Sequence, residues 1–292
     1  MKRVLITGAG SYVGGWVRRR LEQEPERFYV EELDVQDDAW KSFDFSSFDS
    51  VFHVAGIAHV STDPSMEGLY YQVNRDLAVE VGERAKAAGV PQLVFMSSSI
   101  VYGDSSSRDE GPITRETPAN PANFYGRSKL EAEEGLQRLA DERFGVAILR
   151  CPMIYGPGCK GNFPTLAKIA RKLPIFPEVR NKRSVLYVEN LAEFVAQVVD
   201  RGLSGMFWPQ NADYMSTSEA VRLLGEALGS SVHVTRVLSP FASLSLRFTE
   251  AGRKAFGSLY YDMAISDYGF DYRVYGFEES IARYVNGSGD VA

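Results

Sequence analysis

Two side chains four residues apart, Tyr125 and Lys129, have the types and the spacing needed to move a proton together. On a helix, residues i and i+4 share a face, so the phenol and the ammonium are neighbours there. A free phenol has a pKa of about 10, too high for a general base at neutral pH, and a nearby ammonium lowers that pKa by favouring the phenolate. The chain has 15 tyrosines, so such a pair also arises by chance. Its meaning depends on its surroundings.

A hydroxyl-rich segment precedes this pair and is predicted to end a strand. Ser97, Ser98 and Ser99 follow the apolar run at residues 93–96. In an α/β sheet, ligands bind at the carboxyl ends of the strands. Ser98 is therefore expected to hydrogen-bond the reacting oxygen of an alcohol or a carbonyl compound. The alternative is that these serines only cap a helix or form a turn.

A glycine-rich segment at residues 7–14 lies between an apolar run at residues 3–7 and a helical pattern. Such a turn presents backbone N–H groups and a helix N-terminus to the pyrophosphate of a dinucleotide. The spacing is not the commonest fingerprint, because Ser11 occupies the middle position, and a plain strand-to-helix turn is the alternative. The expected cofactor contacts in this turn are Gly8, Gly10, Ser11, Tyr12, Val13 and Gly14.

An acidic residue, Asp34, lies about 20 residues past this turn, at the end of a strand predicted over residues 28–33. A carboxylate in that place binds the ribose hydroxyls of NAD and repels the 2′-phosphate of NADP. Asp34 therefore favours NAD, and NADP stays open. The alternative is a solvated acidic loop, because other acidic residues lie close by in the sequence.

The order of apolar runs and helical patterns indicates which elements position these residues. Strands are expected over residues 3–7, 28–33, 51–55, 93–96 and 146–149, and helices from about residue 13 to Pro25, from Leu77 to Gly89, and from Tyr125 to Leu139. Strands that alternate with helices predict an α/β fold with a doubly wound parallel sheet covered on both faces.

The pattern is less regular after residue 150. The remaining expected elements are a basic helix around residues 166–172, a strand over residues 205–208, a helix that Ser216 caps and Gly229 ends, and a packed helix within residues 240–259. The tail from Gly287 is expected to be loose.

The composition of the 292 residues, 45% hydrophobic and 24% charged, is that of a soluble globular protein. The net charge of −6 argues against nucleic acid or an anionic membrane as a partner, and no apolar run reaches the roughly 18 residues of a membrane helix. With no apolar signal segment and two cysteines, Cys151 and Cys159, a reduced cytoplasmic protein is expected. No ligand spacing predicts a metal site.

Taken together, these motifs resemble those of the extended short-chain dehydrogenase/reductases, in their nucleotide-sugar epimerase/dehydratase branch. The matching segments are T-G-x-x-G-x-x-G at residues 7–14 with Ser11 as a departure, V-F-H-x-A at 51–55, S-S-x-x-V-Y-G at 97–103, Y-x-x-x-K at 125–129, and R-x-x-x-x-Y-G-P at 150–157. The resemblance implies a Rossmann domain over residues 1–157 and about 184–208. It implies a smaller mixed α/β domain for the nucleotide sugar over residues 158–183 and 209–292.

The resemblance also implies roles for single residues. Tyr125 would be the acid and base, Lys129 its partner and a ligand of the nicotinamide ribose, and Ser98 the hydroxyl on the sugar oxygen. The further cofactor contacts that it implies are Val54, Ala55, Gly56, Asn74, Ser97, Pro152 and Ile154. The implied substrate contacts are Ser98, Ser99, Tyr125, Asn162 and Arg183. For Arg183 the alternative is an exposed charge in a basic run.

The leading expectation is an NAD-dependent C4 epimerase of a nucleotide sugar, with a UDP-hexose as substrate, and a homodimer by analogy with the family. Dehydration is set aside, because Ser99 and Ile100 stand where dehydratases carry acidic residues. A 4-keto-sugar reductase that uses NAD(P)H is the alternative, favoured by the short C-terminal half and by Met153, where many C4 epimerases have Asn. Residues 34–51 are also compressed as in some reductases, so Asp34 would then serve the adenine pocket. A cofactor-binding protein without chemistry is the third hypothesis.

Overall fold

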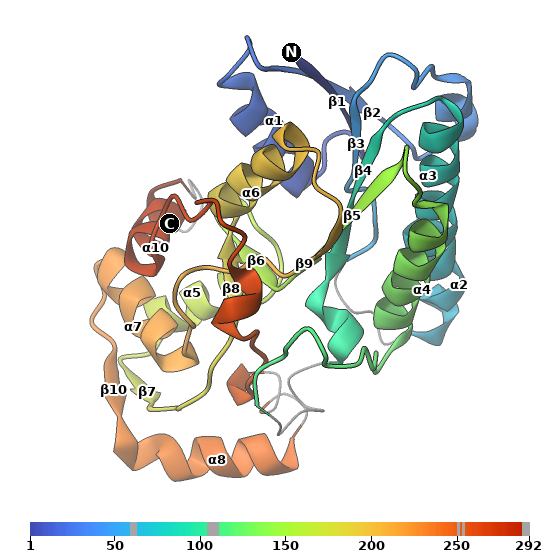
Figure 1. Ribbon diagram of the computed structural model, residues 1–292. Coiled ribbons are helices and arrows are strands. Elements are labelled where there is room, and N and C mark those ends of the chain that lie inside the picture. The colour runs from blue at the N-terminus through green and yellow to red at the C-terminus, as the bar shows by residue number, and fades with distance from the viewer. Residues whose placement is uncertain (59–62, 104–110, 250–251, 253–254, 288–292) are drawn as a thin grey trace.

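Six parallel strands form the central sheet of this computed structural model, in the order β2-β1-β3-β4-β5-β9 (Figure 1). The structure describes all residues except 59–62, 104–110, 250–251, 253–254 and 288–292. The strands are β1 (Lys2–Thr7), β2 (Phe28–Leu33), β3 (Ser50–His53), β4 (Gln92–Ser98), β5 (Gly145–Cys151) and β9 (Gly205–Phe207). The predicted α/β fold with a parallel sheet is confirmed. The loose tail was expected from Gly287, which is the last residue of a helix, and residues 288–292 lie outside the described residues.

Helices cover both faces of the sheet because alternate strand residues point to opposite sides. Val4 and Ile6 of β1 pack in a core with α1 (Tyr12–Glu22) and α6 (Val188–Asp200). Leu5 points the other way, into a core with α3 (Leu77–Ala87) and α4 (Phe124–Leu139). Figure 1 shows α1 and α6 on one side of the strands and α3 and α4 on the other.

The strand predicted over residues 51–55 is two residues too long. β3 ends at His53, and the next two N–H groups, of Val54 and Ala55, both donate to the carbonyl of Thr7, at 3.1 and 3.0 Å. The chain therefore bends toward the end of β1, which brings Ala55 against the glycine-rich turn.

A helical run before α3 was not predicted. It consists of α2 (Glu67–Tyr71) and a π-helical segment (Gln72–Asp76) that leads into α3. Polar residues in the π segment hide the helical period, and its single turn is held by tertiary hydrogen bonds of Asn74.

The C-terminal half forms a second core beside the sheet, where Phe163, Tyr187, Val221 and Ile281 pack together. Its elements are α5 (Asn162–Lys172), α7 (Thr217–Ala227), α8 (Ser239–Phe248), α10 (Phe277–Gly287) and the paired strands β6 (Met153–Tyr155) with β8 (Val185–Tyr187) and β7 (Ile175–Pro177) with β10 (His233–Thr235). Short 3-10 turns lie at Asp38–Ser42, Pro64–Met66, Ser99–Tyr102, Arg236–Leu238 and Met263–Ser266. The predicted Ser216 cap is confirmed, because its side chain accepts from the N–H of Glu219 at 3.1 Å.

The packed helix expected within residues 240–259 is wrong in one respect. α8 forms there, but Phe241, Leu244 and Phe248 are exposed, whereas Ala242 is buried. Among the described residues, every helix is too short or too polar to cross a bilayer.

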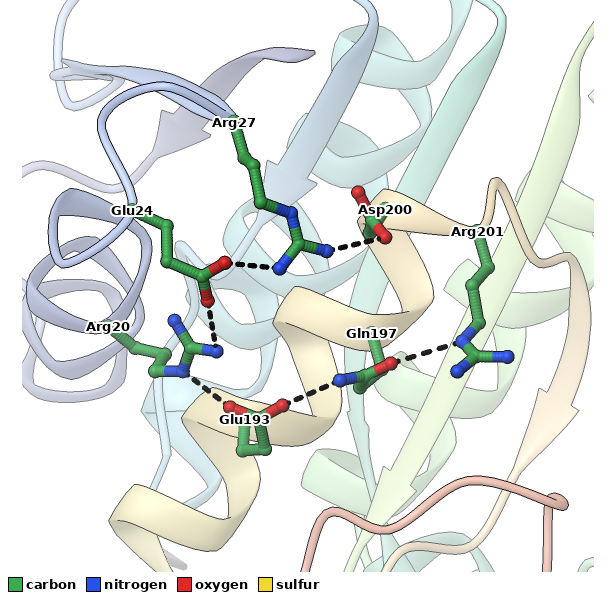
Figure 2. Close-up of polar contacts among 7 residues, drawn as sticks. All are labelled: Arg20, Glu24, Arg27, Glu193, Gln197, Asp200 and Arg201. Atoms are coloured by element: carbon green, nitrogen blue, oxygen red, sulfur yellow. Dashed lines mark hydrogen bonds and ion pairs between the residues drawn. The ribbon is translucent and has the colours of Figure 1, made fainter. Parts of the chain in front are cut away.

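Charged and amide side chains tie α1 to α6 on the outer surface (Figure 2). The chain of contacts runs through Arg20, Glu24, Arg27, Glu193, Gln197, Asp200 and Arg201. Arg20 bridges Glu24 at 2.6 Å and also meets Glu193 of α6. These contacts fix the helix that begins at the glycine-rich turn.

Candidate active site

The glycine-rich turn connects β1 to α1 and leaves its backbone open. Gly8 has φ +111°, and a Cβ on it would lie 2.8 Å from the amide nitrogen of Ala55, so only glycine fits there. Gly10 has φ +72°, and no described atom lies within 4 Å of the position of a Cβ. Ser11, in the middle position, caps α1 by accepting from the N–H of Gly14 at 3.3 Å. Residues 12–15, all described, include no acid, so the helix end suits an anion.

Asp34 lies beside this turn. The N–H groups of Gly8 and Ala9 donate to the carbonyl of Leu33, the preceding residue, at 2.9 and 3.3 Å. The Asp34 side chain is exposed, and one of its oxygens accepts from the N–H of Gln36 at 2.9 Å. The carboxylate thus stands at the end of β2, where it is accessible to a ribose.

The order of the strands changes direction at β1, which has β2 on one side and β3 on the other. Crevices at such switch points are where open α/β sheets bind ligands. The segment that follows β3 lines this place. A Cβ on Gly56 would lie 3.0 Å from Asn74 Oδ1 and 3.2 Å from Lys129 Nζ, so the segment comes close to α4.

Asn74 holds this segment in place. Its side chain accepts from the N–H of Ile57 at 2.8 Å, donates to the Ile57 carbonyl at 3.1 Å, and donates to Ser128 Oγ of α4 at 3.3 Å. Asn74 is fully buried. It therefore joins the loop after β3 to the helix that carries Tyr125 and Lys129.

Tyr125 and Ser98 meet at the carboxyl end of β4. Ser98 Oγ accepts from the N–H of Ile100 at 3.3 Å and shares a hydrogen bond with Tyr125. Burial raises the pKa of Tyr125 to about 12, and the bond to Ser98 opposes that rise. The N-cap Asn123 fixes the start of α4, since its side chain accepts from the N–H of Gly126 at 2.9 Å.

Lys129 is buried one turn further along α4. Its Nζ donates to the carbonyl of Met96 at 2.9 Å and lies 4.7 Å from the ring centroid of Phe95. Burial lowers the pKa of Lys129 to about 8, and the charge of Glu133 opposes this. In this arrangement Ser98 is the group that lowers the pKa of Tyr125, while the ammonium hydrogen-bonds the main chain.

A buried ion pair, missed in the sequence, lies under these residues. Arg150 Nη2 is 2.6 Å from Glu133 Oε2, and Nη1 donates to the hydroxyl of Tyr102 at 2.7 Å. Glu133 also hydrogen-bonds Ser97, the neighbour of Ser98. The sequence signal was the position of Glu133, four residues after Lys129 on the same helix face.

The segment after β5 adds further predicted residues. Pro152 follows Cys151 directly, and Ile154 packs against the core that contains α6. Burial raises the pKa of the Cys151 thiol, so it stays protonated and is a poor nucleophile. The hydroxyl of Tyr12 would lie 2.9 Å from a Cβ on Gly156, so this side chain reaches from the glycine-rich turn to the same segment.

The predicted substrate residues lie further from the sheet. Asn162 is exposed and is the first residue of α5, and Ser99 begins the 3-10 turn after β4. Arg183 is mostly buried, so the alternative of an exposed charge is wrong. Its Nε donates to the carbonyl of Gly257 at 3.0 Å, and burial lowers its pKa to about 10, which leaves it cationic at neutral pH. Among the described residues, no three His, Cys, Asp or Glu side chains gather to hold a metal ion.

Two curated proteins are similar to this chain in sequence. A UDP-glucose 4-epimerase of Vibrio cholerae is 35% identical over 186 residues, which are 61% of this chain and 56% of that protein. An N-acetyl-alpha-D-glucosaminyl-diphospho-ditrans,octacis-undecaprenol 4-epimerase of Escherichia coli O157:H7 is 30% identical over 210 residues, 66% of this chain and 61% of that protein. The chain thus spans little more than half the length of the curated relatives it matches.

Solved structures share the fold over almost the whole chain. The UDP-glucose 4-epimerase of Thermus thermophilus, in complex with NAD, has a TM-score of 0.74 at 20% identity and covers 98% of both chains. A dTDP-4-dehydrorhamnose reductase of Clostridium acetobutylicum has a TM-score of 0.73 at 18% identity and covers 97% of this chain and 98% of that one. The sequence model of one family matches residues 4–207. This chain belongs to the NAD dependent epimerase/dehydratase family.

Proposed function

We propose that this chain is an NAD-dependent epimerase of a nucleotide sugar, most simply a UDP-hexose, that inverts C4 through a transient 4-keto sugar. The observation that carries this is the buried Tyr125, hydrogen-bonded to Ser98 and followed one turn later by Lys129. Both curated relatives described above are 4-epimerases by name. The proposal keeps Asp34 in contact with the cofactor ribose.

The turn fits a dinucleotide. Gly10 leaves open space for a phosphate, and the first turn of α1 offers its N–H groups without a competing acid. Gly56, Asn74 and Lys129 would then surround the nicotinamide end, next to Ser98 and Tyr125. NAD, when bound, supplies reversible hydride transfer at C4 of the sugar.

The proton chemistry belongs to the chain itself. Tyr125 takes the proton from the C4 hydroxyl and returns it, while Ser98 hydrogen-bonds the same oxygen. Because burial raises the pKa of Tyr125 to about 12, its phenolate forms only when positive charge comes closer. Lys129, one turn further along α4, would supply this charge if its Nζ left the Met96 carbonyl.

Residues 158–183 and 209–292 form the sugar-nucleotide side in this proposal, and residues 1–157 with about 184–208 the cofactor side. Arg183 keeps its charge at neutral pH, because its pKa of about 10 is still well above 7, and it would bind the diphosphate. Asn162, exposed at the start of α5, would contact the nucleotide. We also propose a cytoplasmic homodimer, as is usual in the family.

A 4-keto-sugar reductase is the second candidate, because a dTDP-4-dehydrorhamnose reductase shares the fold over nearly the whole of both chains, as fully as the UDP-glucose 4-epimerase does. The two functions differ in how they keep their cofactor. An epimerase must retain the hydride between its two half-reactions, whereas a reductase exchanges NAD(P)H at every turnover.

Denaturing the purified protein and identifying the released nucleotide separates these functions. Near-stoichiometric NAD or NADH is the expected result. An empty protein that binds added NADPH or NADH at micromolar concentration would contradict the epimerase and favour the reductase. A protein that converts no keto sugar with either cofactor would favour the third hypothesis, a binding protein.

A further inference from the structure

Helix α8 turns its large apolar side chains outward. Val237 in the preceding turn and Phe241, Leu244 and Phe248 are exposed by 78%, 70%, 58% and 68%. Their spacings of four, three and four residues place them along one face, which we call the apolar stripe. Ala242, on the inner face, is buried. A helix that buries alanine and exposes phenylalanine is the reverse of a core helix, and such a patch marks an interaction surface.

The N-terminal end of α8 is joined to the body of the molecule. Ser239 Oγ, at the first residue of α8, donates to the carbonyl of Glu178 at 2.8 Å. The strand before it, β10, pairs with β7. The N-terminal end of the apolar stripe is therefore joined to this edge of the molecule.

Basic side chains flank the stripe. Arg236, next to Val237, is 2.7 Å from Glu178, and Arg180 meets the same carboxylate at 3.6 Å, so this trio keeps one positive charge. Both arginine side chains are about four-fifths exposed. Residues 160–183 carry seven lysines and arginines and one acid, although the whole chain has a net charge of −6.

The segment at the start of β7, the strand that pairs with β10, also combines exposed apolar side chains with a basic one. Leu173, just after α5, and Ile175, the first residue of β7, are exposed, and Lys172 at the end of α5 is exposed as well. Apolar side chains with lysine and arginine around them fit a bilayer surface that contains anionic lipid. A second copy fits less well, because a two-fold contact would bring the same basic groups together.

The position of α8 relative to the candidate active site bears on this proposal. In Figure 1, α8 lies along the side of the molecule toward which the carboxyl end of β4 points, which is the side of Ser98. We propose that α8 is an interfacial helix that seats this side of the protein on an anionic phospholipid surface. This inference does not depend on the reaction proposed above, and it differs from the expectation, drawn from net charge, that argues against an anionic membrane as a partner.

Co-sedimentation with vesicles tests this proposal. We expect the protein to bind vesicles of phosphatidylcholine with about 30% phosphatidylglycerol, and to bind them less in high salt. The double variant Phe241→Ser/Leu244→Ser should lower the partition coefficient at least tenfold, because it removes most of the apolar contact. Arg180→Gln should lower it about fivefold. Val274→Ser, at an exposed apolar position outside the stripe, is the matched control and should leave binding unchanged.

Two results would overturn the proposal. One is a wild-type protein that stays in the supernatant with anionic vesicles. The other is a dimer in sedimentation equilibrium that the Phe241→Ser/Leu244→Ser variant dissociates, since a second copy would then cover the stripe. Circular dichroism and the melting temperature of each variant establish that it is folded, which is expected because the substituted side chains are exposed.

Discussion

The side chain of Lys129 is buried, and burial disfavours its charged form. Its pKa of about 8 in the folded chain lies below the roughly 10.4 of an unfolded lysine. Between these two pH values the unfolded chain binds more protons, so this residue makes the fold more stable as pH rises. Below pH 8 the full cost applies, on the order of 3 kcal/mol.

Lys129→Met should therefore be more stable than the wild type at pH 7, by up to about 3 kcal/mol. The difference should shrink as pH rises from about 8 and be nearly gone by about 10.5. Urea unfolding of both proteins at a series of pH values measures this. Lys168→Met, at an exposed position of α5, is the control. A stability difference that does not change with pH would contradict the account.

Gly8 and Gly15 give opposite predictions for the same substitution. A Cβ on Gly8 would lie 2.8 Å from the backbone of Ala55, at a φ of +111°. Gly8→Ala should lower the free energy of unfolding by more than about 1 kcal/mol and weaken cofactor binding. Gly15 lies inside α1 with no described atom within 4 Å of its Cβ position, so Gly15→Ala should stabilise by about 0.5–1 kcal/mol. If both substitutions changed the melting temperature equally, the conformation of the glycine-rich turn would not be what requires glycine at position 8.

At the scale of elements, the buried Glu133–Arg150 pair joins α4 to β5 beneath Ser98 and Lys129. Removing one partner leaves the other charge buried and uncompensated. Glu133→Gln should therefore cost about 3 kcal/mol of unfolding free energy, and it should lower the pKa of Lys129 further, because Glu133 now raises it.

Urea denaturation of Glu133→Gln checks this, with the exposed pair Arg222–Glu226 of α7 as the comparison. Glu226→Gln should cost less than about 1 kcal/mol. The double variant Glu133→Gln/Arg150→Met should recover part of the loss, since no unpaired charge remains. A loss in Glu133→Gln no larger than that in Glu226→Gln would refute a structural role for the pair.

Most of the longer elements of the first 150 residues were predictable, whereas helices α6 and α10 and the short or tertiary elements were not. The strand at residues 28–33 and the turn before α1 follow from local sequence, because an apolar run marks the strand and glycines between a strand and a helix mark the turn. β6 and β7 have three residues each, too few to show a period, and exist because β8 and β10 pair with them. The π turn at Asn74 depends on hydrogen bonds to Ile57 and Ser128, which are distant in sequence.

The candidate site shows the same difference between features set by local sequence and features set by tertiary contacts. The residues of the site lie in motifs with fixed spacing, so Ser98, Tyr125 and Lys129 could be named in advance. The orientation of the Lys129 side chain toward the Met96 carbonyl could not, because it depends on where β4 ends relative to α4. The outward face of α8 was missed because an apolar pattern alone does not tell which side of a helix meets the core.

At the scale of the whole molecule, one side gathers the functions proposed here. The glycine-rich turn, Ser98 and Tyr125 lie at the carboxyl ends of the strands, and the second core, to which α5 contributes Phe163 and Ala167, stands beside the sheet (Figure 1). Charge is also unevenly distributed along the chain, because a chain with a net negative charge has a basic segment at residues 160–183. This division suits a diphosphate substrate and an anionic surface on the same side.

The most direct test of the proposed reaction is to incubate the purified protein with UDP-hexoses without added cofactor and to follow the C4 epimer by NMR. We predict that the wild type interconverts one epimer pair, and that Tyr125→Phe retains bound nucleotide but loses at least about 100-fold in turnover. Tyr29→Phe, at an exposed position on β2, should keep full activity. Near-full epimerisation by Tyr125→Phe, or none by a wild type that reduces 4-keto sugars with NADPH, would contradict this account.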